Sequence, residues 1–73
     1  MNKNILQKAY DICKEKFEIH MQSKNLNVGD IAQQMRVTPN TVKNWINGKS
    51  LPKLKNFCYL LSILNCTQDD ILE

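Results

Sequence analysis

Glycine, proline and cysteine are all scarce in this chain of 73 residues, which contains two glycines, two prolines and three cysteines. The cysteines (Cys13, Cys58 and Cys66) are odd in number and form no CxxC pair, so the sequence indicates neither a disulfide framework nor a zinc site. Cysteine is among the residue types most often buried. We therefore expect all three to be buried apolar residues, and we expect no metal and no cofactor.

Long apolar runs are also missing, and charges are spread through the first residues of the chain. No stretch approaches the roughly 20 apolar residues of a membrane-spanning helix, and the N-terminus lacks the apolar core of a signal peptide. The sequence thus predicts a soluble cytoplasmic protein that does not bind membranes.

Residues suited to catalysis are few: one histidine, His20, three scattered serines and no paired carboxylates that would face a likely pocket. Covalent catalysis needs a nucleophile with an adjacent base. The sequence therefore predicts that the protein is not an enzyme, and no small-molecule substrate is evident.

Acidic residues are absent from positions 31–68, although the whole chain carries a net charge of only +3. Five cations lie in that stretch: Arg36, Lys43, Lys49, Lys53 and Lys55. The acidic residues at the C-terminal end are Asp69, Asp70 and Glu73. An acid-free basic stretch suits a polyanion such as nucleic acid, but it also fits a merely solvated face.

Apolar residues recur at helical spacing along the chain, and no long stretch alternates as a strand would. This predicts an all-α fold in a single domain, residues 1–73. The first helix is expected to begin after Asn4 and to run to about Ser23. Its inward stripe would be Leu6, Tyr10, Cys13, Phe17 and Met21.

Local capping signals delimit the later helices. Asn27 starts a short second helix with Asp30 near its N-terminus, and Thr38-Pro39 starts a third helix, about 39–47, that ends at the left-handed cap Asn47-Gly48. A fourth helix is expected to start at Pro52 with five inward residues: Leu54, Phe57, Leu60, Leu61 and Leu64. Thr67 and Asp70 resemble a capping box for a last short turn.

The second and third helices are separated by only a few residues, which predicts a helix-turn-helix at about 27–47. The outward face of the third helix holds Asn40, Lys43, Asn44 and Asn47 at spacings of three and four residues, opposite Val42, Trp45 and Ile46. Asparagine matches the edge of adenine, and lysine suits guanine or a phosphate. Asparagine is a poor helix former, so base reading would explain the stripe; in a chain with nine asparagines, a solvated face is the alternative.

The run from Leu26 to Leu72 resembles the Cro/cI-type (XRE family) helix-turn-helix domain of phage and bacterial repressors. The resemblance rests on Ile31-Ala32, on Val37-Thr38 with Val42, and on Asn47-Gly48-Lys49 followed by Pro52. It implies a compact five-helix bundle of the lambda-repressor-like type. It also implies a transcriptional regulator, a repressor rather than an activator, whose third helix enters the major groove of double-stranded DNA.

The resemblance also implies which residues contact DNA. Base contacts are implied for Pro39, Asn40, Lys43 and Asn44. Contacts at the DNA backbone are expected for Thr38, Thr41, Asn47, Gly48, Lys49 and Lys53, with help from the amides of the loop after the third helix. We expect a homodimer on a pseudo-palindromic site with half-sites about one turn apart, the N-terminal residues and the last helix being candidate dimer surfaces.

Three departures from the family pattern stand out. Arg36 occupies a turn position usually held by glycine, which costs about 1 kcal/mol if the backbone there is left-handed. Val28 replaces a common glutamine that contacts phosphate. Met21 and Ile46 together replace an Arg–Glu pair, so that no buried charge is left unpaired.

Two other functions are compatible with the same residues. The chain could be a protein-interaction or antitoxin-like module that uses the helix-turn-helix scaffold, with which the acidic C-terminal residues are compatible. It could also be a nonspecific nucleoid protein, whose DNA affinity would depend on salt without discriminating sequence.

Overall fold

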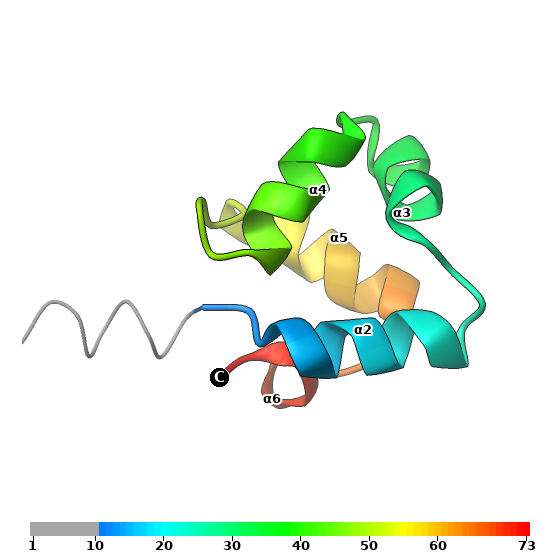
Figure 1. Ribbon diagram of the computed structural model, residues 1–73, viewed down its shortest axis with the longest axis vertical. Helices are drawn as coiled ribbons and strands as arrows, with labels where there is room; N and C mark the ends of the chain where they lie inside the picture. Colours follow the sequence, from blue (N-terminus) through cyan, green and yellow to red (C-terminus); the bar gives the residue numbers. More distant parts are fainter. Residues whose placement is uncertain (1–10) are drawn as a thin grey trace, which may run out of the picture.

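Five α-helices make up most of residues 11–73, the part of the chain that the computed structural model describes (Figure 1). They are α2 (Lys14–Ser23), α3 (Val28–Met35), α4 (Pro39–Ile46), α5 (Leu54–Leu64) and α6 (Gln68–Ile71). In this part of the chain the only β-type pairing outside the helices is one isolated antiparallel bridge, between Ile12 and Leu72. The expected all-α class is therefore confirmed.

Every helix contributes apolar side chains to one compact core. Its fully buried members include Phe17 of α2, Ile31 of α3, Val42 of α4 and Leu60 of α5. The other buried residues are Ile12, Met21, Ala32, Met35, Trp45, Ile46, Leu64 and Ile71. Met21 and Ile46 thus lie in the core, where an apolar pair can stand without charge compensation.

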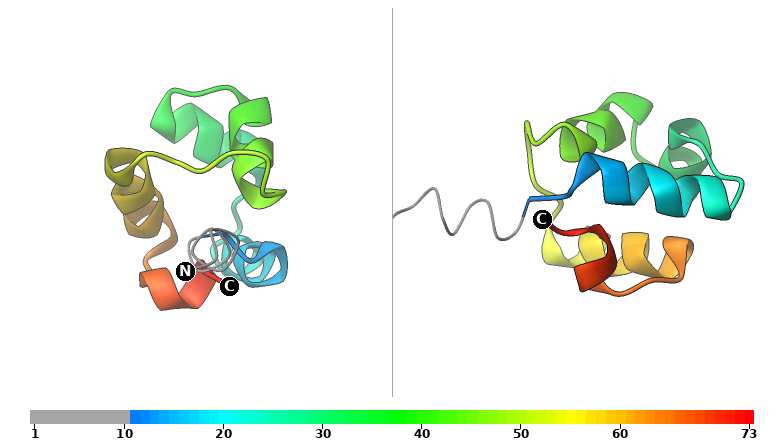
Figure 2. Two further views of the ribbon diagram at one scale, coloured as in Figure 1. Left: turned by 90° about the vertical axis from the view of Figure 1, so that its left-hand side faces the viewer. Right: turned by 60° about the horizontal axis from the view of Figure 1, so that its bottom comes forward.

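The helices are arranged so that α4 and α6 lie on opposite sides of the molecule (Figures 1 and 2). The short helices α3 and α4 pack against each other, α5 packs against α3, and α6 packs against α2. One side chain ties α5 to α3: the hydroxyl of Tyr59 donates a hydrogen bond to the carbonyl oxygen of Gln34 at 3.1 Å. The packing of α5 against α3 and this hydrogen bond therefore attach the α3–α4 pair to the rest of the fold.

The start of the first helix differs from expectation. The helix begins at Lys14, because the residues before it pair with the C-terminal end of the chain instead. The amide of Cys13 donates a hydrogen bond to the carbonyl oxygen of Ile71 at 2.7 Å, and the amide of Glu73 donates one to the carbonyl oxygen of Asp11 at 2.9 Å. This pairing keeps Ile12 buried. The expected end at Ser23 is confirmed, whereas residues 5–10, with Leu6 and Tyr10, lie outside the described part.

The fourth helix and the cysteines also correct the sequence predictions. Helix α5 begins at Leu54, two residues after Pro52, and Leu54 is 77% exposed instead of facing the core. Cys58 is exposed on the same helix, while Cys13 and Cys66 are half-buried, and all three are free thiols. Burial raises the pKa of the Cys66 thiol, so this thiol stays protonated at neutral pH.

None of the helices in residues 11–73 combines the length and the apolar character needed to span a bilayer.

Candidate nucleic-acid interface

Helix α4, which carries most of the residues expected to contact DNA, is positioned by α3 and by the turn between the two helices. Helix α3 starts with a capping box in which the side chain of Asn27 accepts from the amide of Asp30 at 2.8 Å and the carboxylate of Asp30 accepts from the amide of Asn27 at 3.0 Å. It ends where Arg36 adopts a left-handed conformation with φ +58°. The expected helix start is confirmed, and three residues separate α3 from α4.

The N-terminus of α4 is capped as the sequence predicts. The hydroxyl oxygen of Thr38 accepts from the amide of Thr41 at 3.2 Å, and Pro39 occupies the first turn, where its missing N–H is not needed. The hydroxyls of Thr38 and Thr41 are also bonded to each other at 2.9 Å. This leaves one of the two hydroxyl hydrogens free to be donated to a ligand.

The outward face of α4 is polar and is not used by the rest of the fold. Asn40, Lys43 and Asn47 are exposed and Asn44 is half-buried, whereas the opposite face is buried in the core. Across residues 11–73, these four side chains form no hydrogen bond or ion pair with other residues. Their donors and acceptors are therefore available to a ligand.

Trp45 belongs to the buried face of α4. It is 4% exposed, more deeply buried than a residue that stacks on a base or sugar would be. Its indole fixes the rotation of α4 about its own axis, together with Val42 and Ile46. The asparagine and lysine side chains on the other face are therefore presented in a fixed direction.

The C-terminus of α4 closes in a Schellman motif. The amide of Lys49 donates to the carbonyl of Asn44 at 2.9 Å, the amide of Gly48 donates to that of Trp45 at 3.3 Å, and Gly48 has φ +76°. The amide of Asn47 is likewise bonded to the carbonyl of Lys43 at 2.9 Å. The loop amides expected to meet phosphate are thus already used within the chain, and the exposed side chains of Asn47 and Lys49 remain for this contact.

The N-terminus of α3, where the family has its glutamine, offers little to a phosphate. Val28 is half-buried and packs against the core. The carboxylate of Asp30 already lies at this helix end as part of the capping box. A second anion there would meet a like charge, so the contact that a glutamine would make is not replaced.

Charge is distributed unevenly over the described residues. The five cations of the acid-free stretch are exposed along the side formed by the α3–α4 turn, α4, the following loop and the start of α5. Glu73 lines a pocket with Asn47 and Gly48 at the C-terminal end of α4, but Asp69 and Asp70 lie in α6, on the side of the molecule opposite α4 (Figures 1 and 2). This asymmetry favours approach of a polyanion from the α4 side.

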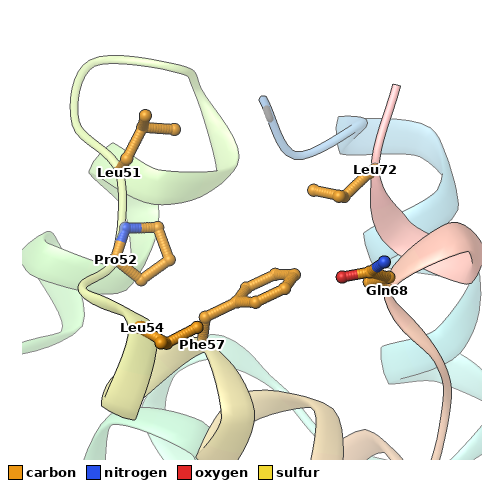
Figure 3. A pocket seen from close by; sticks show the side chains of 6 residues that line it. All are labelled: Leu51, Pro52, Leu54, Phe57, Gln68 and Leu72. Carbon is orange, nitrogen blue, oxygen red and sulfur yellow. The ribbon is translucent and has the colours of Figure 1, made fainter. Parts of the chain in front are cut away.

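An apolar groove of about 270 Å³ lies beside the start of α5 (Figure 3). Its walls come from the α4–α5 loop, α5, α6 and the C-terminal end: Leu51, Pro52, Leu54, Phe57, Gln68 and Leu72. Leu54 is 77% exposed and Leu51 is 39% exposed at its edge. Sequence reasoning missed this groove because helical spacing alone assigned Leu54 to the core.

The structure brings all but one of the expected DNA-contacting residues to a single helix and its two ends. They lie between Thr38 and Lys49, whereas Lys53 is the exposed residue that precedes α5. Comparisons of the chain with protein-family models, with curated proteins and with solved structures give no match. A functional conclusion therefore depends on the geometry and chemistry of α4.

Proposed function

We propose that this protein binds double-stranded DNA in a sequence-specific manner through the outward face of α4, as a transcriptional repressor of the Cro/cI helix-turn-helix type. One observation carries the proposal: Asn40, Lys43 and Asn44 lie on one face of a capped, core-anchored helix, and their side chains are not used in the described fold. If α4 merely presented a solvated face, nothing would require these three polar side chains to share one face on the most basic side of the molecule.

In this proposal α4 enters the major groove. A helix of eight residues is about 12 Å long, comparable to the width of the groove of about 12 Å. The side-chain amides of Asn40 and Asn44 can each donate to N7 of adenine and accept from its N6 amino group. The ammonium group of Lys43 can donate to O6 or N7 of guanine. Pro39 lies at the N-terminal end of the same face, and its ring makes van der Waals contact with bases.

Contacts with the DNA backbone set the position of α4. Lys49 and Lys53 are exposed on the C-terminal side of α4 and neutralise phosphates, while the side chains of Asn47 and the Thr38–Thr41 pair supply hydrogen bonds. Gly48 shapes the loop that carries Lys49. These contacts supply affinity that depends on salt but carry no sequence information.

A second copy of the chain is the proposed occupant of the apolar groove. Lys53 and Lys55 flank Leu54 in the sequence on the α5 wall, and Asp69 follows Gln68 in the sequence on the α6 wall. A two-fold axis would place the basic flank of one copy opposite the acidic flank of the other, with each Leu54 beside its partner's groove. The six residues that line the groove are few against the roughly 20–30 residues that each partner contributes to a stable interface, so this homodimer is expected to form on DNA.

The experiment that tests the proposed function is selection of bound duplexes from a random pool at about 150 mM salt. Recovery of an inverted repeat with half-sites about one helical turn apart would support specific, dimeric binding. Salt-sensitive binding without a motif would favour a nonspecific nucleoid protein. A folded protein that retains no duplex would favour the protein-interaction module.

A further inference from the structure

Four of the helices in residues 11–73 end in the same way. In α2, α3, α4 and α5 an amide beyond the helix reaches back five residues to a carbonyl of the last turn: Leu26 to Met21 at 2.9 Å, Val37 to Ala32 at 3.0 Å, Lys49 to Asn44 at 2.9 Å and Cys66 to Leu61 at 3.1 Å. Each of these Schellman motifs needs one residue in the left-handed conformation. The four motifs can therefore be compared within one molecule.

Three of the left-handed positions hold residues that suit them, and one does not. Asn25 (φ +55°), Gly48 (φ +76°) and Asn65 (φ +51°) are of the two residue types that adopt this conformation most readily. The fourth is Arg36, with φ +58°. Arginine has no short polar side chain that could bond locally to its own backbone, so the conformation is strained there and not at the other three.

No contact within the described fold compensates for this strain. The Arg36 side chain is exposed, and among residues 11–73 it forms no hydrogen bond or ion pair. No acidic residue lies between Asp30 and Asp69 in the sequence. The fold by itself would be more stable with asparagine or glycine at this position.

The position of Arg36 relates it to the proposed DNA-binding face. It lies two residues before Thr38, the cap of α4, in the turn at the N-terminal end of that helix (Figure 1). Lys49 follows the C-terminal end, so a cation stands beyond each end of the helix. The major groove is bordered by phosphates on both sides, and α4 is about as long as the groove is wide.

We propose that Arg36 is a phosphate-binding residue that holds the N-terminal end of α4 on the DNA, opposite Lys49, and that its strained backbone persists because of this contact. The guanidinium group suits phosphate because it can donate two parallel hydrogen bonds. This inference rests on the proposed function, since it assigns a further residue to the same interface.

The test combines stability with the salt dependence of binding to the selected operator. Arg36→Asn is expected to raise Tm by roughly 2–6 °C, because it relieves the strain. The same variant is expected to weaken operator binding roughly three- to tenfold at 150 mM salt and to lower the slope of log affinity against log salt by about one. Because the variant is more stable, unfolding cannot explain weaker binding.

Two variants serve as controls. Arg36→Lys keeps the charge and the strained backbone, and its salt slope and Tm should match those of the parent chain. Lys24→Asn removes an exposed cation from the end of α2, away from α4, and should leave the salt slope unchanged. An Arg36→Asn variant with the parent's salt slope would overturn the inference alone. A parent chain that binds no duplex would overturn both the inference and the proposed function.

Discussion

The carbonyl oxygen of Asn44 accepts a hydrogen bond from the amide of Lys49 at 2.9 Å, across Gly48 in the left-handed conformation. This bond joins a residue proposed to read bases to one proposed to bind phosphate. The loop after α4 is thereby fixed relative to the outward face of the helix. Any change that opens the loop should affect stability and DNA binding together.

Gly48→Ala tests the effect of this loop on stability. A Cβ at this position would meet nothing within 4 Å, so its cost is the left-handed backbone alone. We expect a loss of about 1 kcal/mol in the free energy of unfolding and a Tm lower by about 4–8 °C. Gly48→Asn is the matched control and should lose less, since Asn25 and Asn65 occupy equivalent positions. Equal stability of the alanine variant and the parent in thermal melts would contradict this account of the loop.

Asn44→Ala tests base reading. The carbonyl that accepts from Lys49 is unchanged by this substitution, so Tm should change little. Specific binding should weaken by about 1–3 kcal/mol while binding to unrelated duplexes is kept. Fluorescence anisotropy with the selected operator and with a scrambled duplex measures both. Gln22→Ala on α2 is the control for an exposed amide away from α4, and operator affinity equal in all three proteins would exclude this use of Asn44.

Leu54→Ser tests the proposed contact between two copies. Leu54 is 77% exposed, so the monomer should stay folded and its affinity for a single half-site should be unchanged. Cooperative binding to the full inverted repeat should fall, since the side chain no longer packs beside the partner's groove. Ile19→Ser removes another exposed side chain, 63% exposed on α2, and should leave cooperativity intact. Loss of cooperativity in both variants, or in neither, would argue against the groove as the dimer contact.

Asp70 provides a prediction about pH. The amide and hydroxyl of Thr67 donate to its carboxylate at 2.8 and 3.1 Å and hold the pKa of Asp70 below its usual value. The charged form is thus favoured in the folded protein. The stability it contributes is present at neutral pH and is lost as the pH falls below about 3.9 and through the lowered pKa.

The matching variant is Asp70→Asn. It should have a lower Tm than the parent at pH 7, and the difference should shrink as the pH falls through that range. Asp69→Asn, on the adjacent exposed residue, serves as the control and should follow the parent's curve. A difference between Asp70→Asn and the parent that stays constant down to pH 2.5 would show that the capping box is not the cause.

Local signals in the sequence predicted much of this fold, because capping depends on residues three or four positions apart. Thr38-Pro39, Asn27 with Asp30, and Thr67 with Asp70 mark helix starts that the structure confirms. Gly48 marks the end of α4 in the same local way. The outward stripe of α4 followed from the same periodicity.

Features that depend on distant parts of the chain were not predictable in this way. Residues 11–13 carry a helical pattern but pair with the C-terminal end, some 60 positions away along the chain. Leu54 has the spacing of a core residue, but its helix starts there and turns it outward into the groove. The hydrogen bonds that the loop amides donate within the chain could not be predicted either, because they depend on the geometry of the Schellman motif and not on residue spacing alone.

The central claim is that the outward face of α4 contacts DNA. Titration of the isotopically labelled protein with a duplex that holds one half-site, followed by amide chemical shifts, tests this claim most directly. The largest shifts are predicted from Arg36 to Lys53, with α6 nearly unchanged, because one half-site binds a single copy. Shifts concentrated on α6, or no shifts at saturating duplex, would contradict this claim.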